Sequence, residues 1–317
     1  MRNAFSIRSL TVLLITCVWP LLLWGHEADS REAAMRWSWE PFVIIPILAT
    51  VALYAAGQVR MWRRSGDGLR VWPIVSFAGG VAALVIALDS PVHLLGGQLF
   101  WVHMTQHELL MLVAAPLLVM AHPLVAFLWA LPRHWREQLG RASKSRIWTG
   151  IWMAISSAAA AWIIHAVVLW LWHAPALFEA ALHSEWIHAS QHLCFLGSAL
   201  LFWWTLVHGR HGRLGYGAAV VYVFTTAAHN SVLGALLTFA PRSWYPTYTL
   251  TTKAWSVTAL EDQQLGGLIM WVPAGALLMV IGLALLAAWM GESQRRFQYT
   301  RMASLMKMKT SGVADAP

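Results

Sequence analysis

Cysteine and charge are the two things that this chain has little of. Only Cys17 and Cys194 occur in 317 residues, and neither has a partner at the spacing of a thiolate metal site. A disulfide scaffold and a cysteine zinc site are therefore excluded. Charged residues make up 11% of the chain, whereas a soluble protein carries about 25%. The shortage of charge predicts a protein that resides in a membrane.

Apolar residues fill the chain in long runs. Hydrophobic residues account for 58% of it, and its 21 tryptophans suit the two membrane–water interfaces. A helix of about 20 apolar residues crosses a hydrocarbon core of about 30 Å. Runs of that kind cover residues 41–61, 71–89, 99–121, 147–171, 186–208, 215–239 and 265–290. The predicted fold class is an all-α membrane protein, a seven-helix transmembrane bundle.

The two ends of the chain differ from this apolar middle. Arg2 and Arg8 precede an apolar run over 10–24, which predicts that residues 1–25 are a signal peptide or an N-terminal anchor. Residues 26–40 then form an exported lead-in, 41–290 the transmembrane domain and 291–317 a cytoplasmic tail.

Lysine and arginine are distributed unevenly between the two sides of these spans. Sixteen of them lie between spans one and two, three and four, and five and six, or in the tail, while four lie on the opposite side. The positive-inside rule places the sixteen in the cytoplasm and the mature N-terminus outside. The formal charge of +8 thus indicates the orientation of the chain in the membrane and attraction to membrane lipid, and not binding of nucleic acid.

A short histidine motif occurs twice, each time at the start of an apolar run. The pattern H-x-x-Q-H is found at His103–His107 and again at His188–His192. Residues four apart share one face of a helix, so each copy presents two imidazoles on one stripe. Imidazole is the commonest side-chain ligand for copper, zinc and iron, and ionisable residues inside a membrane usually face the bundle interior. The two motifs together predict a metal or haem site near the outer surface.

Other residues are candidates for the same site. Histidines at the same predicted depth are His165, His229 and His173, and the thioethers of Met104 and Met111 would add affinity for Cu(I). Candidates that could orient the ligands are Gln106, Gln191, Glu108 and Asp262. The alternatives are ordinary: a single histidine at a helix end caps an interface, methionine packs, and Asp262 begins a helix. His93 is a weak candidate.

Four blocks of sequence together resemble a known family. They are W-x-H-M-x-Q-H-x-L-L-M at Trp101–Met111, L-W-H-x-P at Leu171–Pro175, H-x-x-Q-H-L-x-F at His188–Phe195 with the triplet Phe202–Trp204, and D-Q-Q-L-G-G-L-I-M-W at Asp262–Trp271. The chain is similar to the caa3-type cytochrome c oxidase assembly factor family (CtaG) over roughly residues 40–290. The resemblance implies a multi-pass protein of the bacterial inner membrane that helps haem–copper oxidases to mature. Its partners would be an oxidase subunit or other oxidase assembly factors.

Two functions remain open at this point. The first is a metal-handling assembly factor, in which copper supply is the usual inference for the family and zinc stays possible. The second is a haem-binding membrane redox protein with two axial histidines. Enzyme activity is not expected, because His107-Glu108 lacks the second histidine of H-E-x-x-H and the chain has no nucleophile motif.

Overall fold

The computed structural model describes residues 34–65, 71–209 and 215–314, and throughout these ranges the regular structure is helical. Six elements are long and apolar enough to cross a membrane. They are α3 (Pro41–Ser65), α4 (Val71–Leu88), the run from α6 to α7 (Phe100–Met120), α13 (Glu185–His208), α14 (Tyr216–Thr238) and α16 (Ala259–Ala314). A bent helix pair raises the number to seven, which confirms the predicted fold class. The predicted signal peptide or anchor lies outside the described residues.

The fourth predicted span is broken in two. Helices α10 (Arg146–Ile155) and α11 (Ala158–His173) meet at an angle of 61°. Ser156 ends α10 with a side-chain bond to the carbonyl of Trp152, and the Ser157 side chain accepts the Ala160 amide at the start of α11. Serine competes with helical hydrogen bonds in this way. Hydropathy predicts an uninterrupted span here, whereas the helix breaks at these two serines.

The third span is also irregular. It begins as α6 (Phe100–Glu108), widens into the π-helical segment η2 (Leu109–Ala114) and ends as α7 (Ala115–Met120). Single π-helical turns inside α-helices are found mostly at functional sites. The widened turn follows directly after the first H-x-x-Q-H motif.

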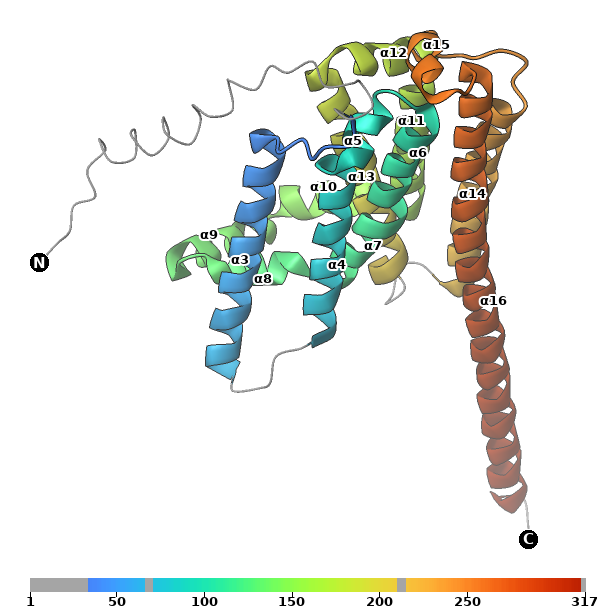
Figure 1. The fold of residues 1–317 in the computed structure, drawn as a ribbon. Helices are drawn as coiled ribbons and strands as arrows, with labels where there is room; N and C mark the ends of the chain where they lie inside the picture. Colours follow the sequence, from blue (N-terminus) through green and yellow to red (C-terminus); the bar gives the residue numbers. More distant parts are fainter. Residues whose placement is uncertain (1–33, 66–70, 210–214, 315–317) are drawn as a thin grey trace, which may run out of the picture.

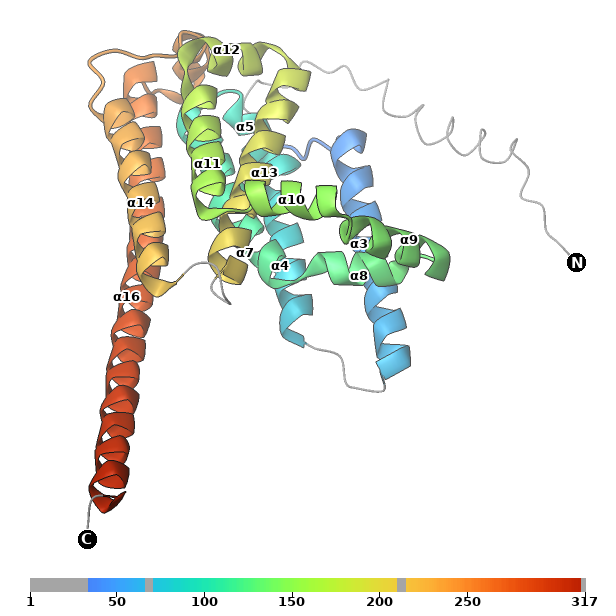
Figure 2. The same cartoon turned by 180° about the vertical axis from the view of Figure 1, so that it is seen from behind.

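Helix α3 stands apart from the other spans. It packs mainly against α8 (Pro123–Ala130), which runs across the lower part of the bundle, as Figures 1 and 2 show. The approach is close, because a Cβ added at Gly57 would come within 2.9 Å of three backbone atoms of Ala126. Beyond α8 the chain continues through the exposed helix α9 (Arg133–Ser143) into α10. Above α8, α3 is thus held away from α4.

Helix α16 runs past the boundary predicted at residue 290. It remains helical to Ala314 and extends well below the other helices (Figure 1). Its first part packs along α14, and glycines allow the close approach: a Cβ at Gly267 would lie 2.8 Å from the Gly234 carbonyl oxygen. The predicted cytoplasmic tail therefore continues the last span as one helix over its described part.

Short helices close the upper end of the bundle in Figure 1. They are α5 (Pro91–Gly96), α12 (Pro175–His183), α15 (Tyr248–Thr251) and the 3₁₀ turn η4 (Thr252–Trp255). Beneath them Phe100, Phe178 and Tyr245 stack at centroid distances of 4.2 to 5.5 Å. This aromatic layer joins the start of α6 to α12 and to the segment before α15, next to His103.

Candidate metal centre

The two H-x-x-Q-H motifs meet face to face. Helix α6 carries His103 and His107, and α13 carries His188 and His192. The ring centroids of His103 and His188 are 5.1 Å apart, and those of His107 and His192 are 5.5 Å apart. One ring nitrogen from each of His103, His188 and His192 lies within 4.8 Å of the others. We call these four residues the histidine cluster.

Buried nitrogen lone pairs distinguish this cluster from ordinary hydrogen-bonded histidines. Both ring nitrogens of His107 and the Nε2 atoms of His188 and His192 have no hydrogen-bond partner in the described part of the chain. His103 is fully buried, and His107 is 1% exposed. A buried polar atom without a partner costs about 1–3 kcal/mol. Several such atoms facing one another indicate a site whose ligand satisfies them together.

Hydrogen bonds orient two of the histidines. Both ring nitrogens of His103 have polar neighbours: Nδ1 lies 3.4 Å from the Tyr248 hydroxyl, which donates to the Gly96 carbonyl at 2.9 Å, and Nε2 lies 3.3 Å from Gln191 Oε1. The Nδ1–H of His173 donates to the Leu169 carbonyl at 2.7 Å. A neutral imidazole that donates through Nδ1 keeps its lone pair on Nε2. Buried His173 lies 6.0 Å from His107 by ring centroids, and thus beside the cluster.

Tyr248 serves only as a neutral hydrogen-bonding group. Burial, and secondarily the charge of Asp262, raise the pKa of the Tyr248 hydroxyl well above its ordinary value. The hydroxyl therefore stays protonated at physiological pH and can donate to Gly96 while its oxygen lies 3.4 Å from His103 Nδ1.

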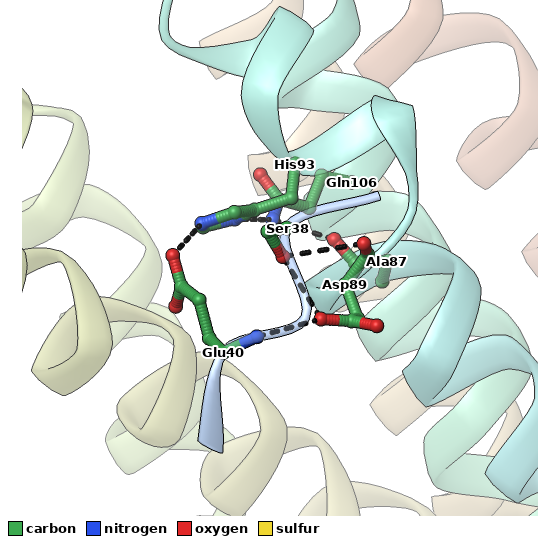
Figure 3. A network of polar contacts seen from close by, with 6 residues as sticks. All are labelled: Ser38, Glu40, Ala87, Asp89, His93 and Gln106. Atoms are coloured by element: carbon green, nitrogen blue, oxygen red, sulfur yellow. Dashed lines mark hydrogen bonds and ion pairs between the residues drawn. The ribbon is translucent and has the colours of Figure 1, made fainter. Parts of the chain in front are cut away.

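His93 is the residue that sequence reasoning undervalued. Its ring stacks on His188 at 5.4 Å and 12°, yet both of its nitrogens are engaged. Gln106 donates to His93 Nδ1 at 3.1 Å, so Nε2 carries the proton and faces the Glu40 carboxylate at 3.5 Å (Figure 3). Gln106 also donates to the Ala87 carbonyl. His93 therefore borders the cluster, and both of its ring nitrogens already have partners.

Of the other predicted residues, one lies beside the cluster and two contact other parts of the chain. The amide oxygen Oε1 of Gln191 lies 3.3 Å from Nε2 of His103 and can orient that ring. Asp262 lies elsewhere, because its two oxygens accept the backbone amides of Phe100 and Trp101 at the start of α6. Met104 is fully buried and packs towards Gly266 of α16. Neither Asp262 nor Met104 adds to the cluster.

A second group of predicted residues lies deeper in the bundle. Glu108, Met111 and His165 line a small cavity of about 10 Å³ together with Asn230. These residues come from α6, η2, α11 and α14. His229 lies near this level, where its ring packs edge-on against Trp162 at 5.4 Å. The structure thus separates the predicted site residues into two levels.

A large apolar cavity borders the cluster from the side. It has a volume of about 520 Å³ and is bounded by residues of α3, α4 and α13. His93, His188 and His192 lie on its wall together with Glu40 and Glu185, and the remaining lining is mostly aliphatic. The offset position of α3 therefore leaves an apolar approach to the imidazoles.

Comparison with known proteins identifies the family. The family model for the cytochrome c oxidase caa3 assembly factor (Caa3_CtaG) matches residues 52–292. This chain belongs to that family. The match includes both H-x-x-Q-H motifs and every helix that lines the deeper cavity. The resemblance seen in the four sequence blocks is confirmed.

Relatives of this chain occur in mycobacteria. An uncharacterized protein of Mycobacterium leprae is 25% identical over 294 residues, which are 87% of this chain and 43% of the relative. An uncharacterized protein of Mycobacterium bovis is 27% identical over 291 residues, with the same two shares. The chain spans less than half the length of these curated relatives. No solved structure matches the chain.

The donor set of the histidine cluster fits a borderline or soft metal ion. Three imidazole nitrogens within mutual reach match the ligands of copper and zinc, and no carboxylate is among them. His107 and His173 stand next to these three and offer further lone pairs.

Proposed function

We propose that this protein is a non-enzymatic assembly factor that binds copper at the histidine cluster and passes it to a cytochrome c oxidase subunit. One observation carries the proposal. His103, His188 and His192 bring three buried imidazole nitrogens within 4.8 Å of one another, in a chain of the oxidase assembly family. Membership of that family supports the oxidase as the recipient, and the ligand chemistry supports copper.

A delivery factor must release the ion as well as bind it. One ion requires fewer imidazoles than are present here. His107 of the cluster, and His173 beside it, adjoin the three grouped ligands. Exchange among alternative ligands lets an ion leave in steps, without the cost of breaking every bond at once. The apolar cavity reaches His188 and His192 from the side of α3, which suits a recipient that is itself embedded in the membrane.

Haem is the alternative occupant of the cluster, and the spacing of the rings favours an ion. His103, His107, His188 and His192 have neighbouring centroids 4.2 to 5.5 Å apart. Aromatic rings at these separations are in direct contact. A porphyrin between two of these rings would have to separate α6 from α13, whereas a single ion would not.

Elemental analysis of the purified protein with an absorption spectrum tests the proposal. We expect about one copper ion per chain at the cluster, no Soret band, and loss of this copper in the His107→Ala/His192→Ala double variant. The control is His183→Asn, which changes an exposed histidine of α12 that bonds only its own helix. Unchanged copper content in the double variant would refute the copper site, zinc alone would change the cargo, and a Soret band would favour haem.

A further inference from the structure

The deeper cavity lies within the bundle, below the histidine cluster, and its lining residues come from six helical elements, α6, η2, α11, α13, α14 and α16. Its volume of about 10 Å³ is about that of one water-sized sphere, which is the least that can hold a water molecule or an ion. A cavity of this size in a tightly packed core, lined by several polar atoms, requires a physical reason.

Three of the lining residues offer polar atoms to the cavity, and two of them have no hydrogen-bond partner in the described chain. The Oε2 atom of Glu108 and the Oδ1 atom of Asn230 are buried without a partner. His165 contributes through its tautomer: the Ser198 hydroxyl donates to the Phe195 carbonyl at 3.1 Å, so it accepts from His165 Nδ1–H at 3.2 Å. The lone pair of His165 is therefore on Nε2, as in His173.

Met111 adds a sulfur to these oxygen and nitrogen donors. It is 5% exposed and lines the cavity from the π-helical segment. Its carbonyl accepts the indole N–H of Trp203 at 2.8 Å, which fixes the backbone beside the cavity. A thioether with an imidazole is a ligand pair that selects Cu(I) over harder ions.

The charge of the cavity lining indicates the oxidation state of the bound metal ion. Among the described residues that line the cavity, Glu108 is the only carboxylate, and none is a lysine or an arginine. A buried charge is tolerated only when it is paired. One carboxylate and one monovalent cation give a neutral site, whereas a divalent ion would leave an uncompensated charge in the bundle.

We infer that Glu108, Met111, His165 and Asn230 form a second, inner site for a monovalent soft cation, Cu(I). This inference rests on the proposed copper-handling function and adds a step to it. Met111 follows His107 by four residues, and His165 precedes His173 by eight, so the inner site is roughly 6–12 Å below the cluster. Copper then binds at two successive sites, first at the cluster near the surface and next at the inner site within the bilayer.

X-ray absorption at the copper edge distinguishes the two sites, because only the inner one contains sulfur. Protein loaded with Cu(I) under reducing conditions is expected to show a copper–sulfur shell that Met111→Leu abolishes, while cluster copper remains. Glu108→Gln is expected to lower the copper content by the inner ion. The controls Met104→Leu and Cys194→Ser are expected to keep the sulfur shell, since Met104 packs towards α16. Far-UV circular dichroism and a monodisperse elution profile establish that each variant is folded.

Failure of the inner site and failure of the cluster look different in this experiment. Copper bound by nitrogen alone, or a sulfur shell that persists in Met111→Leu, overturns the inner site and leaves the proposed function intact. The His107→Ala/His192→Ala variant is expected to retain a sulfur-ligated ion when copper is supplied in detergent. Loss of the sulfur shell in that variant, with nitrogen-bound copper unchanged, would also overturn the assignment.

Discussion

The carboxylate of Asp262 accepts a hydrogen bond of 2.7 Å from the backbone N–H of Phe100, 162 residues earlier in the chain. Its other oxygen accepts the amide of Trp101 at 3.1 Å. The N-terminus of α6 has no capping side chain of its own at Leu99. Asp262 supplies that cap from the first turn of α16, and a carboxylate also suits the positive end of the helix dipole. The contact fixes the turn that carries His103.

Replacing Asp262 by alanine should destabilise the protein without removing a metal ligand. The two amides of α6 lose their acceptor, and loss of a cap or of a buried acceptor costs about 1–3 kcal/mol. We expect a lower thermal unfolding midpoint and unchanged maximal copper content. The control is Glu137→Ala on the exposed helix α9, which removes only a surface ion pair with Arg133. A midpoint equal to that of the control would contradict the capping role.

Tyr248→Phe tests whether the hydroxyl orients His103. Without the hydroxyl, Nδ1 of His103 loses its polar neighbour and the Gly96 carbonyl loses its donor. Groups that orient metal-binding histidines typically change metal affinity by about 10–100-fold. We therefore expect copper affinity to fall within that range, measured by competition with a Cu(I) chelator, while the stoichiometry is unchanged.

Tyr245→Phe is the matched control for that experiment. Tyr245 is as deeply buried as Tyr248 and also donates to a carbonyl, that of His173 at 2.9 Å, but it contacts no cluster nitrogen. Its removal should affect stability and leave copper affinity within about threefold, since the ligand tautomers are untouched. An equal loss of affinity in both variants would mean that Tyr248 acts only through packing.

The histidine cluster could be predicted because its signal is local. Histidines four residues apart on two apolar helices have to share a face, and the meeting of His103 with His188 follows once α6 packs on α13. The membrane spans are predictable for the same reason, since hydropathy is read within one window. The fourth span shows the limit, because Ser156 and Ser157 break it through side-chain bonds that hydropathy does not register.

The other parts of the site depend on tertiary contacts. His93 joins the cluster only because α5 folds back over α6, although Ser90-Pro91 is a recognisable helix start that could have placed it. Asp262 and Met104 each look like site residues in sequence, and both face other neighbours. The separation of Glu108, Met111 and His165 into a deeper level follows from helix packing, which spacing along one chain cannot reveal.

Close packing of α14 on α16 predicts opposite effects for two glycines of one helix. A Cβ at Gly267 would lie 2.5 Å from Thr238 Oγ1 and 2.8 Å from the Gly234 carbonyl oxygen, so backbone has to move. Overpacking of this kind costs about 1–3 kcal/mol. At Gly275 a Cβ meets nothing within 4 Å, and alanine there favours the helix by roughly 0.5–1 kcal/mol. Thermal unfolding should show a lower midpoint for Gly267→Ala and an equal or higher one for Gly275→Ala.

Copper should stabilise the folded protein through the cluster, because only the folded chain brings α6, α11 and α13 together around one ion. Binding at a hundredfold excess over the dissociation constant adds about 2.7 kcal/mol to the free energy of unfolding. We expect Cu(I) to raise the unfolding midpoint of the wild type and of His183→Asn, and to raise that of His188→Asn much less. The lost nitrogen of His188 is one of the three within 4.8 Å, so an undiminished shift in this variant would place the stabilising ion elsewhere in the chain.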